Sequence, residues 1–372
     1  MAADLSAADV AQLANAKTDP RVRAEMIGKV SASFAGGSLS PSERALAEDI
    51  FRAMARDVEV RVRHAMMDAL KDSPDVPRDV AMKMATDVAE VAVPFLEMTT
   101  VLTDEDLIEI IRSQGQDHQI AVARRSSVSE AVSDALVETN NEAVVATLVS
   151  NSGAQLSEAT MSKVLDSFGH VKPIATSMAE RNALPLPIAE RLVTLVSAKM
   201  QSHLEKASGL NKKTAKAVGV EAREKATVSL LDGSHDAPDI HALVDQLHKS
   251  GRLTHTLVVR ALCMGDMVFF ETGLARLAGI PVSNVYRLIH EKGTKGLERL
   301  FIKLGVDKKM FEIALVALDL SKDLKLDSRD DREHFRSVML DRVLTKLGET
   351  QDVDSLDFLM RKIGHSGARK AA

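Results

Sequence analysis

One short pattern recurs along the first half of this 372-residue chain and constrains its fold. An aliphatic residue precedes Ser, Thr or Pro, and a helical run follows. After a longer first step, the pattern returns about every 26–28 residues, a spacing typical of helical repeat proteins. Ser and Thr cap helix N-termini, and Pro is tolerated in the first turn, so each copy predicts a helix start. The copies are Leu39-Ser40, Val76-Pro77, Leu102-Thr103, Val128-Ser129, Leu156-Ser157 and Leu184-Pro185.

Each predicted first helix is followed by a tight turn and a second helix. The turns carry Asp or Asn, as in Arg56-Asp57 and Thr86-Asp87, and the second helices begin with Val-rich stretches such as Val60 to Arg63. One such pair cannot bury its own apolar face, but stacked pairs can. The sequence therefore predicts an all-α fold, a HEAT-like or leucine-rich-repeat-variant-like α-solenoid (an α-α superhelix). It places about five or six helix pairs in residues 1–197.

Composition supports this fold class and excludes several others. Aromatic residues make up 3% of the chain, with no Trp and one Tyr, whereas sheets favour aromatic residues. The single cysteine, Cys263, excludes an intramolecular disulfide and a multi-cysteine zinc site, and its apolar surroundings predict a buried, unreactive thiol. The N-terminus has early acidic residues and no long apolar run, so we expect neither a secretory signal nor a membrane span. The resulting expectation is a cytoplasmic protein.

Three longer strings resemble one known family. They are VRVRHAMMDALKDSPDVPRDVAMKMATDVAEVAVPFLEMTTVLTDEDLIEII from residue 60, ARRSSVSEAVSDALVETNNEAVVATLVSN from residue 123, and RALCMGDMVFFETGLARLAGIPVSNVYRLI from residue 260. They look like an alphaproteobacterial helical-repeat family, domain of unknown function 2336. The resemblance covers about residues 20–320 and implies a HEAT-like fold. It implies no catalytic residues.

The repeat rhythm stops after residue 197. Residues 198–237 are predicted to form a charged helical connector, which either is simply solvated or offers a basic surface to an acidic partner. Helical periodicity resumes in 238–320, the next predicted domain. Residues 321–372 are predicted to hold C-terminal helices and a loose tail. Within the RALCMGD string, Arg260 and Asp266 are expected to form a structural ion pair.

The segment Leu274 to Ile289, LARLAGIPVSNVYRLI, has the residue order of a helix-turn-helix, with Gly279 at the turn. Bacterial repressor headpieces have a similar string. An ordinary corner between two helices has the same turn chemistry, and the second helix carries just Arg287 and His290 as basic groups. In a DNA-binding protein, the residues that begin the groove-entering helix would be Ser283, Asn284, Tyr286 and Arg287.

No motif for catalysis is found. Walker, GxGxxG, GxSxG and HExxH patterns are absent from the sequence, and its 11 His are scattered. We therefore expect no catalytic residues, no metal site and no cofactor. DNA-base glycosylases do occur among HEAT-like arrays, but they need stacking aromatics that this chain lacks.

These observations predict a non-enzymatic scaffold or adaptor that binds a partner protein on the solenoid surface. The alternative is a DNA-binding or transcriptional regulator that uses residues 274–289. Basic residues in or just after the second helices are the candidates for holding an acidic segment of the partner. They are Arg61, Arg63, Arg124, Arg125 and Arg181.

Overall fold

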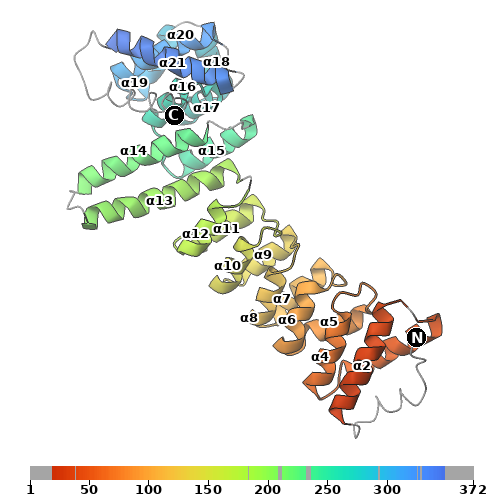
Figure 1. Cartoon of the computed structure of the whole chain (residues 1–372). Coiled ribbons are helices and arrows are strands. Elements are labelled where there is room, and N and C mark those ends of the chain that lie inside the picture. The colour runs from red at the N-terminus through yellow and green to blue at the C-terminus, as the bar shows by residue number, and fades with distance from the viewer. Residues whose placement is uncertain are drawn as a thin grey trace, which may run out of the picture. The chain divides into compact units, whose positions relative to one another are not determined.

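The computed structural model describes residues 19–347, except 38, 183, 208–211, 232–235, 292–293, 325 and 327–328. Every regular element in this part of the chain is a helix, apart from one isolated parallel bridge between Val128 and Ala154 (Figure 1). The predicted all-α repeat fold is confirmed. The chain divides into two compact units, Met1–Asn182 and Ala183–Ala372.

The N-terminal unit is a series of helix pairs. Its described helices are α2 (Pro20–Ala35), α3 (Pro41–Met54), α4 (Val60–Leu70), α5 (Arg78–Ala85), α6 (Ala89–Met98), α7 (Asp104–Ser113), α8 (Gln116–Ala123), α9 (Glu130–Glu138), α10 (Glu142–Ser150), α11 (Glu158–Phe168) and α12 (Lys172–Ala179). The second helices pack in sequence, α2 on α4, then α6, α8, α10 and α12. Among the first helices, α3 packs on α5, and α9 packs on both α7 and α11. Each pair thus covers the apolar face of its neighbour.

The recurring cap signal starts the first helices as predicted. Ser40, Thr103, Ser129 and Ser157 are N-cap residues, and each side chain accepts a hydrogen bond from the backbone N–H three residues on. Pro77 precedes α5 without a side-chain cap. The aliphatic residues before these positions are buried at Val76, Leu102, Val128 and Leu156, whereas Leu39, before Ser40, is only partly buried. Because capping and this packing are local, the sequence pattern alone is enough to place the helix starts.

The C-terminal unit begins with two long helices that lie side by side (Figure 1). Its described helices are α13 (Leu186–Ala207), α14 (Lys212–Leu230), α15 (Ala237–Lys249), α16 (His255–Cys263), α17 (Met267–Ala278), α18 (Val282–His290), α19 (Thr294–Lys303), α20 (Lys308–Asp323) and α21 (Arg329–Leu347). The core gathers around Phe269, Phe270, Phe301 and Phe335. The expected boundary at residue 197 falls inside α13, and the expected connector 198–237 comprises the end of α13 and all of α14.

Two buried carboxylates join α13 and α14 to the helices that follow. Glu190 is fully buried and pairs with Arg252 across 2.8 Å (Oε1 to Nη1). Glu224 is 4% exposed and pairs with Arg260 across 3.0 Å (Oε2 to Nη1). Asp266, expected from the sequence to pair with Arg260, accepts the Phe269 N–H and caps α17. A partner 36 residues away lies beyond any local pattern.

Candidate interaction surfaces

Two of the five candidate arginines bridge successive helix pairs. Arg125, just after α8, donates to the carbonyls of Leu96 and Thr99 at the end of α6. Arg181, just after α12, donates to the carbonyl of Val149 in the last turn of α10 and to those of Asn151 and Ala154 beyond it. The last carbonyls of a helix have no partner within the helix, so these guanidinium groups satisfy them from the next pair. Burial lowers the pKa of both arginines below its ordinary value.

Asn151 extends this set of bridges between Arg125 and Arg181. Its side-chain amide donates to the carbonyls of Ala123 and Arg125 at the end of α8, across 2.8 and 2.7 Å. A polar side chain after α8, α10 and α12 therefore reaches back to the end of the preceding second helix each time. Asn151 lies in the polar stretch that ends the unit, and no sequence pattern singles it out for this role.

Arg63 also links successive helix pairs, but at the turns between first and second helices. It donates to both carboxylate oxygens of Asp87, with the Nη2–Oδ1 distance at 2.7 Å, and to the carbonyl of Asp57. Asp57 in turn pairs with Arg23 across 3.0 Å, and all four side chains are nearly buried. The recurring Asp of the turn between first and second helices is thus the acceptor that links neighbouring pairs. Its regular position was the sequence signal for this role.

Arg61 and Arg124 are the two candidates with exposed side chains. Arg124 lies 3.4 Å from Glu97, and that pair is largely solvated. The five arginines therefore divide into three half-buried braces and two exposed residues, rather than forming one basic ridge.

The exposed charge on the first helices of the middle pairs is acidic. Over α7, α9 and α11, seven exposed carboxylates stand beside two exposed basic residues, Arg112 and Lys163. Asp106 and Asp134 are less exposed and bond to neighbouring first helices, through Arg78 and Thr160. The exposed acids are Asp104, Glu105, Glu109, Glu130, Glu138, Glu158 and Asp166.

In the C-terminal unit, the segment predicted as a helix-turn-helix forms two helices joined by a tight turn. Gly279 ends α17 in the left-handed conformation, at φ 67°, and α18 starts three residues later. Val285 and Ile289 anchor α18 in the core. The four candidate residues on α18 are all exposed: Ser283, Asn284, Tyr286 and Arg287.

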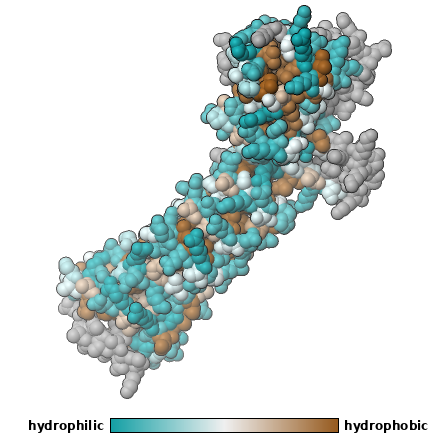
Figure 2. Space-filling model, turned by 180° about the vertical axis from the view of Figure 1, so that it is seen from behind, coloured by the Kyte–Doolittle hydropathy of each residue, from teal (hydrophilic) through white to brown (hydrophobic). Residues whose placement is uncertain are grey.

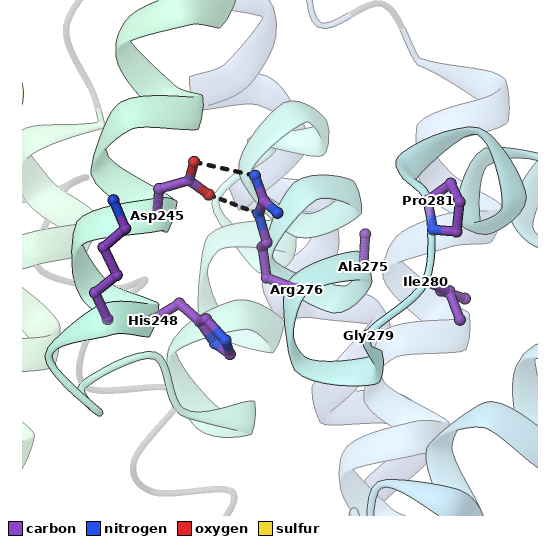
Figure 3. Close-up of a pocket in the computed structure, with 8 residues that line it drawn as sticks. Asp245, His248, Ala275, Arg276, Gly279, Ile280 and Pro281 are labelled. Carbon is purple, nitrogen blue, oxygen red and sulfur yellow. Dashed lines mark hydrogen bonds and ion pairs between the residues drawn. The ribbon is translucent and has the colours of Figure 1, made fainter.

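A groove of about 450 Å³ runs between α15 and the turn after α17. Asp245 and Arg276 face each other across it as a two-point ion pair, at 2.6 and 3.0 Å (Figure 3). His248 and Lys249 line the α15 side, and Pro281 lies at the start of α18. The pair neutralises Arg276, and the Lys249 ammonium adds a positive charge to the lining.

The remaining features to consider are the single cysteine, possible metal ligands and the apolar surface. Cys263 is buried, and burial raises the pKa of its thiol to about 12. The described residues contain no group of three or more His, Cys, Asp or Glu that could hold a metal ion. Across the same residues, no helix is long and apolar enough to cross a bilayer. On the face shown in Figure 2, the N-terminal unit is mainly hydrophilic, and more hydrophobic surface gathers over the C-terminal unit.

Comparison with known proteins identifies a family. The model for an uncharacterised protein conserved in bacteria, DUF2336, matches residues 91–350. The match covers most of the chain, and the protein belongs to this family. The match begins and ends later than the resemblance over about residues 20–320, so it leaves out α2 to α5 and takes in α21. No curated protein and no solved structure shows significant similarity to the chain.

Proposed function

We propose that this protein is a non-enzymatic, cytoplasmic scaffold whose HEAT-like array of helix pairs holds a partner protein. Helical arrays of this kind present a long continuous surface, and such surfaces commonly bind other proteins. The described residues of the N-terminal unit carry exposed charges and internal braces, and no group of three or more His, Cys, Asp or Glu among them could hold a metal ion. The partner, in this proposal, lies along the first helices α7, α9 and α11.

The observation that carries the proposal is the excess of exposed carboxylates on those three helices. Acids in the first turn stabilise a helix because they interact favourably with its dipole, which accounts for Asp104, Glu105, Glu130 and Glu158. Glu109 lies away from the first turn of its helix, so the dipole does not account for it. Glu138 also lies outside the first turn, and its Oε1 is 3.8 Å from Lys163 Nζ in a pair that is more than half exposed on both sides. A surface of one charge sign selects a partner of the opposite sign and speeds encounter.

The expected partner segment is therefore basic, not acidic. The sequence alone favours an acidic segment against the arginines, but Arg63, Arg125 and Arg181 already bond to neighbouring repeats. Breaking those bonds to bind a partner would leave buried carbonyls without donors, which is costly.

The test is charge reversal combined with crosslinking in the native cells. A photo-crosslinking residue at position 112 on α7 should capture the same partner reproducibly, with the crosslink mapping to a Lys- and Arg-rich segment. The triple variant Glu109→Lys, Glu138→Lys, Glu158→Lys should lose this crosslink. Its matched control reverses three exposed acids on second helices, Glu90, Asp117 and Glu142.

Both variants should keep the helical circular dichroism of the native protein. The control acids all lie in first turns, so any loss of helix stability weighs more on the control. Equal capture by the two variants, or a crosslink to an acidic segment, would show that the first-helix surface is not the binding face.

A further inference from the structure

We propose that the C-terminal unit carries a second binding site, separate from the repeat surface, that binds double-stranded DNA with α18 in the major groove. The site, which we call the α18–α19 surface, consists of exposed residues on two successive helices. They are Ser283, Asn284, Tyr286 and Arg287 on α18, and Lys295, Arg299 and Lys303 on α19.

The way α18 is held leaves its polar residues available. Val285 and Ile289 pack into the core. The residues on either side of Val285 remain solvent-exposed: Ser283, Asn284, Tyr286 and Arg287. The sharp turn at Gly279 brings the start of α18 out of the core. In a helix-turn-helix, the first residues of the second helix contact base edges in the major groove.

The neighbouring helix supplies the positive charge that the sequence of α18 lacks. α19 buries Leu297, Leu300 and Phe301, and this orientation places Lys295, Arg299 and Lys303 in solvent. From α18 to the start of α20, the described residues include six Lys or Arg and three Asp or Glu, in a chain of net charge -5. Phosphate contacts from such side chains provide most of the affinity of proteins for DNA.

Arg287 is already paired, but weakly. Its Nε lies 3.2 Å from Glu291 Oε2, and both side chains are more than half exposed. Exposed pairs of this kind contribute little, so a phosphate or a guanine can replace the carboxylate.

Asn284 and Tyr286 offer more specific contacts. Asn amides pair with adenine in the major groove, and Asn284 is in the first turn of α18. The Tyr286 ring is 50% exposed and stacks on His290 with the ring centroids 4.3 Å apart. His290 Nε2 is 3.0 Å from Glu271 Oε1, which holds the imidazole, and thus the tyrosine, against α17.

Charge and shape favour DNA over a membrane. Among the large apolar residues of α18 and α19, Val282, Tyr286 and Ile302 are exposed, and these three do not make the broad apolar face that membrane-surface helices need. The test below also measures binding of poly-glutamate, which stands for an acidic protein partner.

The experiment measures fluorescence anisotropy of a labelled mixed-sequence duplex of about 30 base pairs with the full chain, at roughly 50–300 mM KCl. We expect binding that weakens with salt, with a log–log slope of about -3 to -4. The triple variant Lys295→Gln, Arg299→Gln, Lys303→Gln should reduce the size of that slope by about 3 and the low-salt affinity by about 30-fold.

The matched control neutralises three exposed basic residues elsewhere, Arg112→Gln, Arg124→Gln and Lys322→Gln, and should stay within about twofold of the native affinity. Asn284→Ala tests base contacts separately. It should change the sequences recovered from a randomised duplex pool, while the affinity for mixed-sequence duplex changes by about twofold or less.

Several results would overturn the proposal. No anisotropy change at the lowest salt would do so, as would a salt slope that the α19 variant leaves unchanged. Tighter binding of poly-glutamate or of phosphatidylserine vesicles than of the duplex would assign the surface to a different partner. None of these results bears on the first-helix surface, so the two proposals fail independently.

Discussion

Arg125 Nη2 donates to the Thr99 carbonyl across 2.7 Å and joins the end of one helix pair to the end of the preceding pair. The guanidinium also donates to the Leu96 carbonyl, so a single side chain caps two groups that α6 leaves unpaired. A residue chosen from the sequence as a contact for another protein is thus a contact within the protein's own array.

Arg125→Met should destabilise the array by about 2–4 kcal/mol, because two buried carbonyls lose a charged donor. Amide hydrogen exchange should accelerate in α6 and α8, and urea unfolding of the full chain should begin at lower denaturant. Arg124→Met is the control, since that side chain is 58% exposed. Its expected cost is under about 1 kcal/mol, and an equal cost for both variants would contradict the brace.

Asp106 should make the N-terminal unit sensitive to acid. Its hydrogen bond to the Arg78 guanidinium, 2.9 Å from Oδ2 to Nε, lowers the pKa of the carboxyl below its ordinary value. A depressed pKa stabilises the fold above the unfolded pKa, near about 4, and the stabilisation is lost as pH falls through the folded value. Asp106→Asn should therefore lower Tm at pH 7, and the difference from the native protein should shrink toward about pH 2. A difference that stays constant across this range would exclude the charged contact as its cause.

Gly279→Ala should destabilise the C-terminal unit by about 1 kcal/mol, since its φ of 67° lies in the left-handed region, where a Cβ is unfavourable. A Cβ would meet no atom within 4 Å there, so the cost is in the backbone and not in packing. Gly28 also has open space around its Cβ position, but it lies inside α2. Gly28→Ala should therefore stabilise by about 0.5–1 kcal/mol, and the opposite signs can be read from two thermal unfolding curves.

Cys263 should resist alkylation in the folded protein. The side chain is 1% exposed, and burial raises the thiol pKa to about 12, so at pH 8 it is a protonated and shielded thiol. Iodoacetamide should modify it at least about 100-fold more slowly than in about 6 M guanidinium, as followed by intact mass. Equal rates in the two conditions would show that α16 opens readily.

The helix starts were predictable because they depend on neighbours in the sequence. Ser129 caps α9 through the backbone N–H of Val132, only three residues on, and Val128 is buried beside it. The corner at Gly279 was predictable for the same reason, since the turn needs a residue that tolerates positive φ. The family was also recognisable from the sequence, since the strings from residues 123 and 260 lie inside the region that the family model matches.

The roles of the charged residues were not predictable, because each depends on a partner in another helix pair. Arg125 and Arg124 are adjacent in sequence, yet one is a half-buried brace and the other is mostly solvent-exposed. Likewise, nothing local to Arg260 indicates Glu224 as its partner. The sequence by itself determined where helices begin, where they turn and that they repeat, since those are interactions within about four residues. The tertiary structure decided which charges became internal bonds and which stayed on the surface, because stacking of helices sets those distances.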